Sequence, residues 1–122
     1  MFYIENDQIY LTRGDDAVLE VAILTGDDEV YQLQEGDMLT LSVRRQPSPA
    51  SPVLLQVSSV TGRLILSHAD TEKLGAGRYS ADVQLTTASA ERYTVWPLLS
   101  GRKRSQASNY ENFIIMPEVT AL

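Results

Sequence analysis

The chain contains no cysteine, and this absence removes several classes of protein at once. Disulfide bonds, thiolate metal sites and a cysteine nucleophile are excluded, so a disulfide-stabilised extracellular module is not expected. Histidine is almost as scarce, because His68 is the only one. A histidine metal triad therefore cannot form, and a Ser-His-Asp relay would depend entirely on this residue.

Long apolar runs and glycine-rich phosphate-binding motifs are also missing from the sequence. A membrane-spanning helix needs about 20 mostly apolar residues, so we expect no membrane insertion. The start, Met1 to Asp7, has no basic region and contains an acid at Glu5, which predicts no secretory signal peptide. No Walker loop, dinucleotide fingerprint or Gly-x-Ser-x-Gly elbow is present. We therefore expect a protein made in the cytoplasm that is not an enzyme and needs no cofactor.

Composition and charge indicate one acidic domain with a core of its own. The 122 residues carry a formal net charge of -6, and 43% of them are hydrophobic. This length is sufficient for one hydrophobic core, and the apolar content is too high for a disordered chain. An acidic surface repels the phosphate backbone, so nucleic acid is not an expected partner. We expect a single domain over residues 1–122, with flexible arms at 1–6 and 118–122.

Alternation of apolar and polar residues is the clearest structural pattern in the chain. It runs unbroken through residues 78–86, where the apolar positions are Tyr79, Ala81, Val83 and Leu85. A period of two is typical of a half-buried β-strand. The pattern recurs between clusters of Gly, Asp, Pro and Ser, and predicts strands at 8–13, 17–24, 39–43, 53–58, 63–67, 78–87, 92–99 and 112–116.

The segments between these strands indicate how the chain turns. Turn signals recur about every 8 to 12 residues, which is typical of a Greek-key sandwich. Residues 46–52 include three prolines and predict an exposed loop. Asp70 to Gly75 predicts a single helical turn that is capped by Asp70 and ended by Gly75. We predict an all-β, antiparallel β-sandwich of about seven or eight strands with one short helical turn near 70–75.

Two acidic motifs have both a functional and a structural interpretation. Arg13-Gly14-Asp15 spells the tripeptide that integrins bind, but we interpret it as a turn that ends a strand. Paired acids at 15–16 and 27–29 suggest calcium. Each group alone supplies too few oxygen ligands, so we interpret both as solvated turns.

Three other features also have both a functional and a structural interpretation. His68 lies between Ser67 and Asp70, and we interpret it as a loop histidine rather than as part of a hydrolase triad. Tyr93 and Trp96 lie on a predicted strand, where packing is favoured over sugar stacking. A third feature, the cationic cluster Arg102, Lys103 and Arg104, either binds a polyanion or an acidic partner, or forms a solvated loop. No aromatic residues interleave this cluster, which argues against nucleic acid.

Five short segments, taken in order, carry a resemblance to a known family. They are Ile9 to Asp15, Leu33 to Asp37, Leu74 to Tyr79, Asp82 to Leu85 and Glu118 to Thr120. Together they resemble small phage tail or baseplate structural proteins, an immunoglobulin-like family of prophages in Gram-positive hosts, similar to the N-terminal domain of baseplate upper proteins. The resemblance spans most of the chain. The basic stretch 101–108 departs from the family's short approach to the last strand, which leaves the role of that loop open.

The resemblance implies an immunoglobulin-like sandwich that acts as a non-enzymatic assembly module through protein-protein contacts. The implied partners are other phage structural proteins or a second copy of the chain, and the implied location is the virion after synthesis in the bacterial cytoplasm. Candidate interaction residues are Arg102, Lys103 and Arg104 in the basic stretch, with Phe2 and Tyr3 in the N-terminal arm. The alternative is a soluble binding module for a host-surface glycan or protein, which exposed tyrosine and tryptophan would favour.

Overall fold

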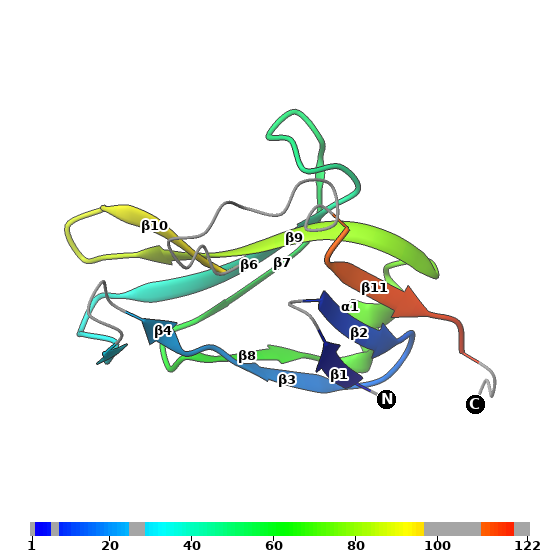
Figure 1. Ribbon diagram of the computed structural model, residues 1–122, viewed down its shortest axis with the longest axis horizontal. Helices are drawn as coiled ribbons and strands as arrows, with labels where there is room; N and C mark the ends of the chain where they lie inside the picture. The colour runs from blue at the N-terminus through cyan, green and yellow to red at the C-terminus, as the bar shows by residue number, and fades with distance from the viewer. Residues whose placement is uncertain (1, 6–7, 25–28, 97–110, 119–122) are drawn as a thin grey trace.

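The structure is a computed structural model that describes residues 2–5, 8–24, 29–96 and 111–118, with side chains described from residue 8 onward except that of Leu24. Figure 1 shows two layers of strands, a large sheet and a smaller one beneath it. In the described part of the chain the one α-helix is α1, His68–Glu72. No helix described there is long and apolar enough to cross a membrane.

Seven strands form the large sheet, in the order β1-β2-β11-β9-β6-β7 with β10 paired to β9. Their bounds are β1 Phe2–Glu5, β2 Gln8–Thr12, β6 Met38–Arg44, β7 Val53–Ser59, β9 Gly77–Thr86, β10 Arg92–Trp96 and β11 Phe113–Met116. Every pair is antiparallel except β2 with β11, where Phe113 lies opposite Ile9. The predicted all-β sandwich is confirmed, but its large sheet is mixed, because β2 and β11 run in the same direction.

The second layer is built from two short pairs. β3, Ala17–Glu20, pairs antiparallel with β8, Arg63–Leu66, and β4, Ile23–Leu24, pairs antiparallel with β5, Val30–Tyr31. The strand predicted over 17–24 is thus divided in two, although its alternation persists through the break. Leu19 and Ile23 are buried while Val18 is exposed. Alternation in the sequence thus corresponds to alternation in burial across both strands.

The core lies between the layers and follows the alternation in the sequence. All four apolar residues of β9 named above are buried, and Leu39, Leu41 and Val43 of β6 are fully inaccessible. Leu64 and Leu66 of β8 close the core from the other layer. Burying a side chain of this size contributes about 1.5 to 3 kcal/mol. The inner positions of the strands therefore supply much of the stabilisation of the sandwich.

Helix α1 forms the connection between β8 and β9. The structure places its N-cap at Ser67 rather than at Asp70, because Ser67 and Asp70 form a reciprocal capping box. Asp70 N–H donates to Ser67 Oγ at 3.2 Å, and Ser67 N–H donates to Asp70 Oδ2 at 3.0 Å. The C-cap is Lys73 rather than Gly75. The helical turn therefore lies at 68–72, slightly earlier than predicted.

Tyr79 joins this connection to the start of β9. Its hydroxyl donates to Gly75 O at 2.6 Å, and its ring is buried beneath the guanidinium of Arg45, 4.5 Å from the ring centroid. A tyrosine bonded back to the backbone at this corner is a hallmark of immunoglobulin-like sandwiches. Ala81, two residues later, occupies the position where antibody domains hold a disulfide cysteine. The fold is thus an all-β, immunoglobulin-like sandwich in which packing replaces that crosslink.

The sequence also predicts two terminal arms and an exposed loop at 46–52. Residues 2–5, expected as part of an arm, form β1 in register with β2, with Phe2 opposite Leu11. The loop at 46–52 contains bends and turns but no strand, as predicted, and the Arg44 guanidinium donates to carbonyls of Pro49 and Ser51 within it. Of the proposed C-terminal arm, only Glu118 lies among the described residues.

Candidate protein-binding surfaces

The Arg13-Gly14-Asp15 turn is a structural joint between β2 and α1. The Arg13 guanidinium donates to Leu74 O at 3.1 Å and to Glu72 O at 2.9 Å. Gly14 has a φ of +88°, in the left-handed region that favours glycine. Because the guanidinium is bonded to the end of α1, it is not presented at a loop tip as integrin binding would require. The interpretation as a turn is therefore favoured.

Thr71 completes this joint from the helix side. Its hydroxyl accepts from Gly14 N–H at 3.0 Å and donates to Asp15 O at 2.9 Å, and the residue is fully buried. One side chain thus satisfies a donor and an acceptor of the β2–β3 turn. Polar groups in a buried position need such partners.

His68 and its polar neighbours likewise have structural contacts. The backbone N–H of His68 donates to Asp16 Oδ1 at 2.6 Å, and its Nδ1 lies 3.2 Å from the same oxygen. Ser67 and Asp70, the two residues that would complete a hydrolase triad, are the partners of the capping box. His68 is bonded to a neighbouring residue, as predicted, but it is the first residue of α1 rather than a loop residue.

The acidic clusters do not converge in the described part of the structure. The pair Asp27 and Asp28 lies outside the described residues. Within the described ranges there is no group of three or more His, Cys, Asp or Glu side chains that could hold a metal ion. The described acids therefore give no support to a calcium site.

The candidate interaction residues from the sequence are only partly placed. Arg102, Lys103 and Arg104 lie outside the described residues, as does the rest of the 101–108 stretch. Phe2 and Tyr3 lie on β1, where Tyr3 is opposite Tyr10, but their side chains are not described. β1 itself is an edge strand of the large sheet. An interaction through the N-terminal residues would therefore involve the edge of β1.

A hydrogen bond from a tyrosine hydroxyl to a carboxylate links the β4–β5 hairpin to the turn before β6. The Tyr31 hydroxyl donates to Asp37 Oδ2 at 2.5 Å, and Gln34 N–H donates to the same oxygen at 2.8 Å. The hydrogen bond from Tyr31, aided by that from Gln34, holds the pKa of Asp37 below its ordinary value. The same bond to Asp37 raises the pKa of Tyr31. Both shifts favour the paired state near neutral pH, so the pair stabilises this end of the sandwich.

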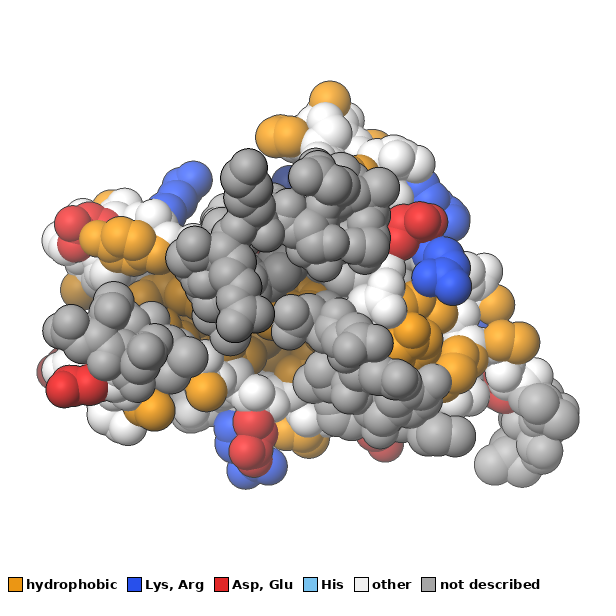
Figure 2. Space-filling model, in the orientation of Figure 1, with side chains coloured by type: hydrophobic (Ala, Val, Ile, Leu, Met, Phe, Trp, Pro, Cys, Tyr) orange, Lys and Arg blue, Asp and Glu red, His pale blue; other side chains and the backbone are white. Residues whose placement is uncertain are grey.

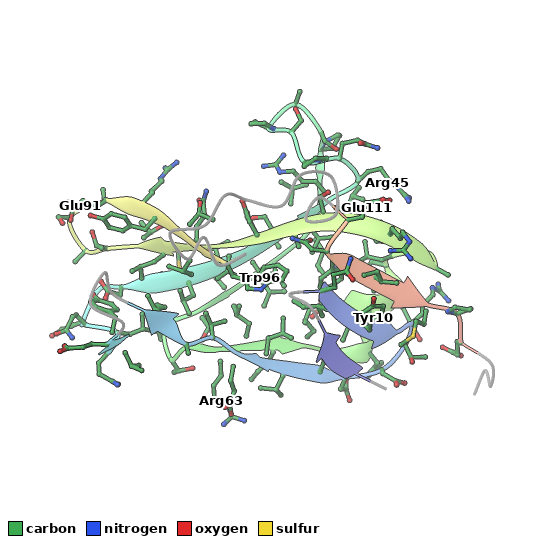
Figure 3. All side chains as sticks on the ribbon, viewed as in Figure 1. Tyr10, Arg45, Arg63, Glu91, Trp96 and Glu111 are labelled. Atoms are coloured by element: carbon green, nitrogen blue, oxygen red, sulfur yellow. The ribbon has the colours of Figure 1, made fainter. Side chains whose placement is uncertain are left out.

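Aromatic side chains offer little surface for stacking a sugar. Tyr79 and Phe113 are buried, and Trp96 packs against the core. Figure 3 shows Trp96 directed from β10 into the space between the layers. Tyr93 is 51% exposed and is the one described aromatic side chain with large exposure. A glycan platform generally uses several aromatic faces, so a single exposed ring gives it weak support.

The outer face of the β3–β8 pair presents apolar side chains to solvent. Val18 and Ile65 lie directly opposite each other, with 37% and 64% of their surfaces exposed. The next pair on this outer face is Glu20 and Arg63, whose Oε1 and Nε atoms are 3.7 Å apart. Figure 3 shows Arg63 pointing away from the core, and Figure 2 shows acidic and basic side chains together at that place. This face, defined by Val18, Ile65, Glu20 and Arg63, is the β3–β8 face.

Both long edges of the β3–β8 pair are unpaired within the described ranges. Val21 N–H donates to Gly62 O at 3.0 Å, which makes positions 21 and 62 a hydrogen-bonded pair. Because such pairs alternate along an antiparallel ladder, the backbone groups of Val18 and Ile65 point outward at the two edges. The face therefore combines exposed apolar side chains with open backbone donors and acceptors.

Alternation in the sequence is sufficient to orient the two strands of this face. Val18 alternates with the buried Ala17 and Leu19, and Ile65 alternates with the buried Leu64 and Leu66. The sequence shows an apolar residue at an outer position on each strand. These two residues form one patch only because β3 pairs with β8, and alternation alone does not specify that pairing.

Comparison of the chain with models of protein families, with curated proteins and with solved structures found no match.

Proposed function

We propose that the chain is a non-enzymatic structural module of a phage tail or baseplate that acts through protein-protein contacts. The observation that carries the proposal is the β3–β8 face. An exposed apolar pair on a narrow sheet with two open edges is a surface suited to another protein, because association buries the side chains and pairs the backbone groups. The phage assignment comes from the sequence resemblance alone.

Rigid sandwiches suit this role for a physical reason. Strands fixed by a packed core hold an edge and a face in constant geometry, so little conformational entropy is lost on assembly. Here α1 is held by Thr71 and Arg13, and the β4–β5 hairpin by Tyr31. These contacts keep the surroundings of the β3–β8 face ordered before a partner arrives.

The test is reconstitution with phage tail and baseplate structural proteins as candidate partners. Co-expression followed by size-exclusion chromatography with light scattering should give a complex of defined stoichiometry. Ile65→Lys should weaken that complex, because it places a charge in the apolar contact, whereas Thr94→Lys on exposed β10 serves as the matched control. A chain that elutes alone with all of these proteins, or a complex indifferent to Ile65→Lys, would overturn the proposal.

The alternative, a binding module for a host-surface glycan or protein, has Tyr93 as its one structural support. A Tyr93→Ala variant tested on a glycan array would lose binding if that ring were a stacking platform. The β3–β8 face offers more exposed apolar surface than Tyr93 does, and its open edges have no counterpart in a sugar-stacking site. The assembly role is therefore preferred.

A further inference from the structure

β7 is the least protected strand edge in the described structure. It is the last strand of the large sheet, and nothing described pairs with its outer side. No charged residue occurs from position 46 to position 62, a range that contains β7 and the turns at both its ends. Natural sheets commonly protect exposed edges with charges or with very short strands. β3 and β8 differ from β7 in having four residues each and in carrying the charged residues Glu20 and Arg63.

The hydrogen bonds of the sheet show which backbone groups of β7 face outward. Ala81 of β9 bonds to Asn112 with both its N–H and its C=O, so these groups point away from β6. Along a strand the backbone N–H and C=O groups point to alternate sides. The groups of Leu41 on β6 therefore point away from β9 and toward its partner Val57 on β7. The N–H and C=O groups of Gln56 and Ser58 therefore point to the open side.

We propose that two copies of the chain pair through β7, antiparallel, about a two-fold axis at Val57. In this register Gln56 of each copy lies opposite Ser58 of the other copy. Each of these two residue pairs forms two backbone hydrogen bonds, which gives four in total. The two large sheets become one continuous sheet. The proposal deepens the assembly function and rests on it, because it names a second copy of the chain as one of the partners.

The side chains along β7 are self-complementary in the same register. Leu54 and Val60, 41% and 69% exposed, come opposite each other at both ends of this register, Leu54 at the register shift in β7 and Val60 one residue beyond the strand. Val57, which packs half-buried against the core, meets Val57 of the second copy on the inner side. The polar residues Gln56 and Ser58 meet in the middle of the outer face. Apolar groups thus meet apolar groups, and no charges are brought together.

Other two-fold edge pairings are less favourable. Pairing β3 with itself about Val18 would oppose Glu20 to Asp16, and pairing about Glu20 would oppose that residue to its own copy. Pairing through β8 is limited to four residues. Each copy also has a net charge of -6, so contact is least opposed at a charge-free edge.

The interface is small, so the dimer should be weak and dependent on concentration. One strand pair with a few apolar contacts falls below the roughly 1,200 to 2,000 Å² buried by standard stable interfaces. Sedimentation velocity over a wide range of protein concentration is the appropriate measurement. Amide hydrogen exchange should show protection of Gln56 and Ser58 that rises with concentration.

The register is tested by charge substitutions at positions 54 and 60. Leu54→Lys with Val60→Lys puts like charges opposite each other and should weaken association by about tenfold or more. Leu54→Lys with Val60→Glu puts opposite charges there and should restore much of it. Within one copy the two positions are about 20 Å apart along the strand, so the rescue cannot arise inside the chain. Thr94→Lys on exposed β10 is the matched control, and thermal melts of every variant monitor folding.

The results of these experiments distinguish pairing through β7 from the more general assembly function. Loss with the lysine pair, rescue with the lysine and glutamate pair, and no effect of Thr94→Lys would support pairing through β7. A wild-type chain that stays monomeric, or a dimer that both double variants leave unchanged, would overturn it. A monomer that still forms complexes with neighbouring structural proteins would leave the assembly function standing, and these two failures are therefore distinguishable.

Discussion

At the scale of single residues, Asn112 is the clearest case of one side chain replacing a strand. It is buried where the chain enters β11, and its amide accepts from Ala81 N–H at 2.8 Å and donates to Ala81 O at 2.9 Å. Its own carbonyl accepts from Ile9 N–H at 2.8 Å. Asn112 therefore continues the sheet between β9 and β2 at a point that neither β10 nor β11 covers.

Replacing Asn112 with alanine should be strongly destabilising. The change leaves the N–H and C=O of Ala81 without partners in a buried position, at a cost of about 1 to 3 kcal/mol for each group. Chemical denaturation gives the free energy of unfolding directly. Glu111→Ala, at the exposed neighbouring position, is the control and should be nearly neutral. Equal effects of the two changes would show that the bridge to Ala81 contributes nothing.

The pair of Tyr31 and Asp37 makes a prediction about pH. The folded-state pKa of Asp37 is lowered, so its stabilisation is present above the unfolded-state pKa and is lost as pH falls through the folded-state pKa. The pKa of Tyr31 is raised, so its contribution is present below its ordinary value near 10 and is lost as pH rises through the folded-state pKa. The stabilisation that the pair provides should thus fade at both acid and alkaline extremes.

Tyr31→Phe provides the measurement for this pair. The difference in unfolding free energy between wild type and Tyr31→Phe should be present at neutral pH and should shrink on acidification below the ordinary range of an aspartate. It should also shrink at strongly alkaline pH. Glu35→Gln, a change at an exposed carboxylate nearby, is the control for general charge effects. A difference that stays constant with pH would contradict the assigned contact.

At the scale of elements, the joint between α1 and the β2–β3 turn depends on Thr71. Thr71→Val keeps the shape of the side chain but removes the contacts to Gly14 N–H and Asp15 O. The loss of a buried partner for these groups should cost about 1 to 3 kcal/mol of stability. The same chemical change at exposed Thr94 is the control. Proteolysis within α1 that is no faster in Thr71→Val than in wild type would indicate that other contacts hold the helix.

The strands were predictable from the sequence because their signal is local. In β9 every second residue faces the opposite layer, so alternation in the sequence becomes alternation in burial. The helical turn was also visible, but its cap was not assigned correctly, because both Ser67 and Asp70 are good caps. The pattern Ser-x-x-Asp favours the serine once the reciprocal bond is considered.

The order of the strands was not predictable in the same way. The parallel pair of β2 and β11 joins segments about one hundred residues apart, and its register depends on packing rather than on alternation. The candidate surfaces could not be predicted from the sequence for the same reason. Val18 and Ile65 become one patch only because β3 pairs with β8, and the charge-free range around β7 matters only because β7 lies at an edge.

At the scale of the whole molecule, charge separates two modes of association. The net charge of -6 makes copies repel one another at long range, whereas β7 has no charge of its own. Salt screens that repulsion, with a Debye length of about 10 Å at 0.1 M. Association through β7 should therefore strengthen as ionic strength rises. Association through the cationic cluster Arg102, Lys103 and Arg104 with an acidic patch should instead weaken, because salt screens attraction as well.

The salt dependence can be checked with the same variants. Wild type should dimerise more tightly at physiological than at low ionic strength in sedimentation experiments. The Leu54→Lys, Val60→Glu variant keeps the net charge of -6 but should gain less affinity under the same change, because its interface then contains exposed ion pairs that salt screens. A smaller gain in this variant than in wild type would place the interface on β7. A wild-type dimer that weakens with salt would instead assign self-association to charged groups, and the cationic cluster would be the first segment to substitute.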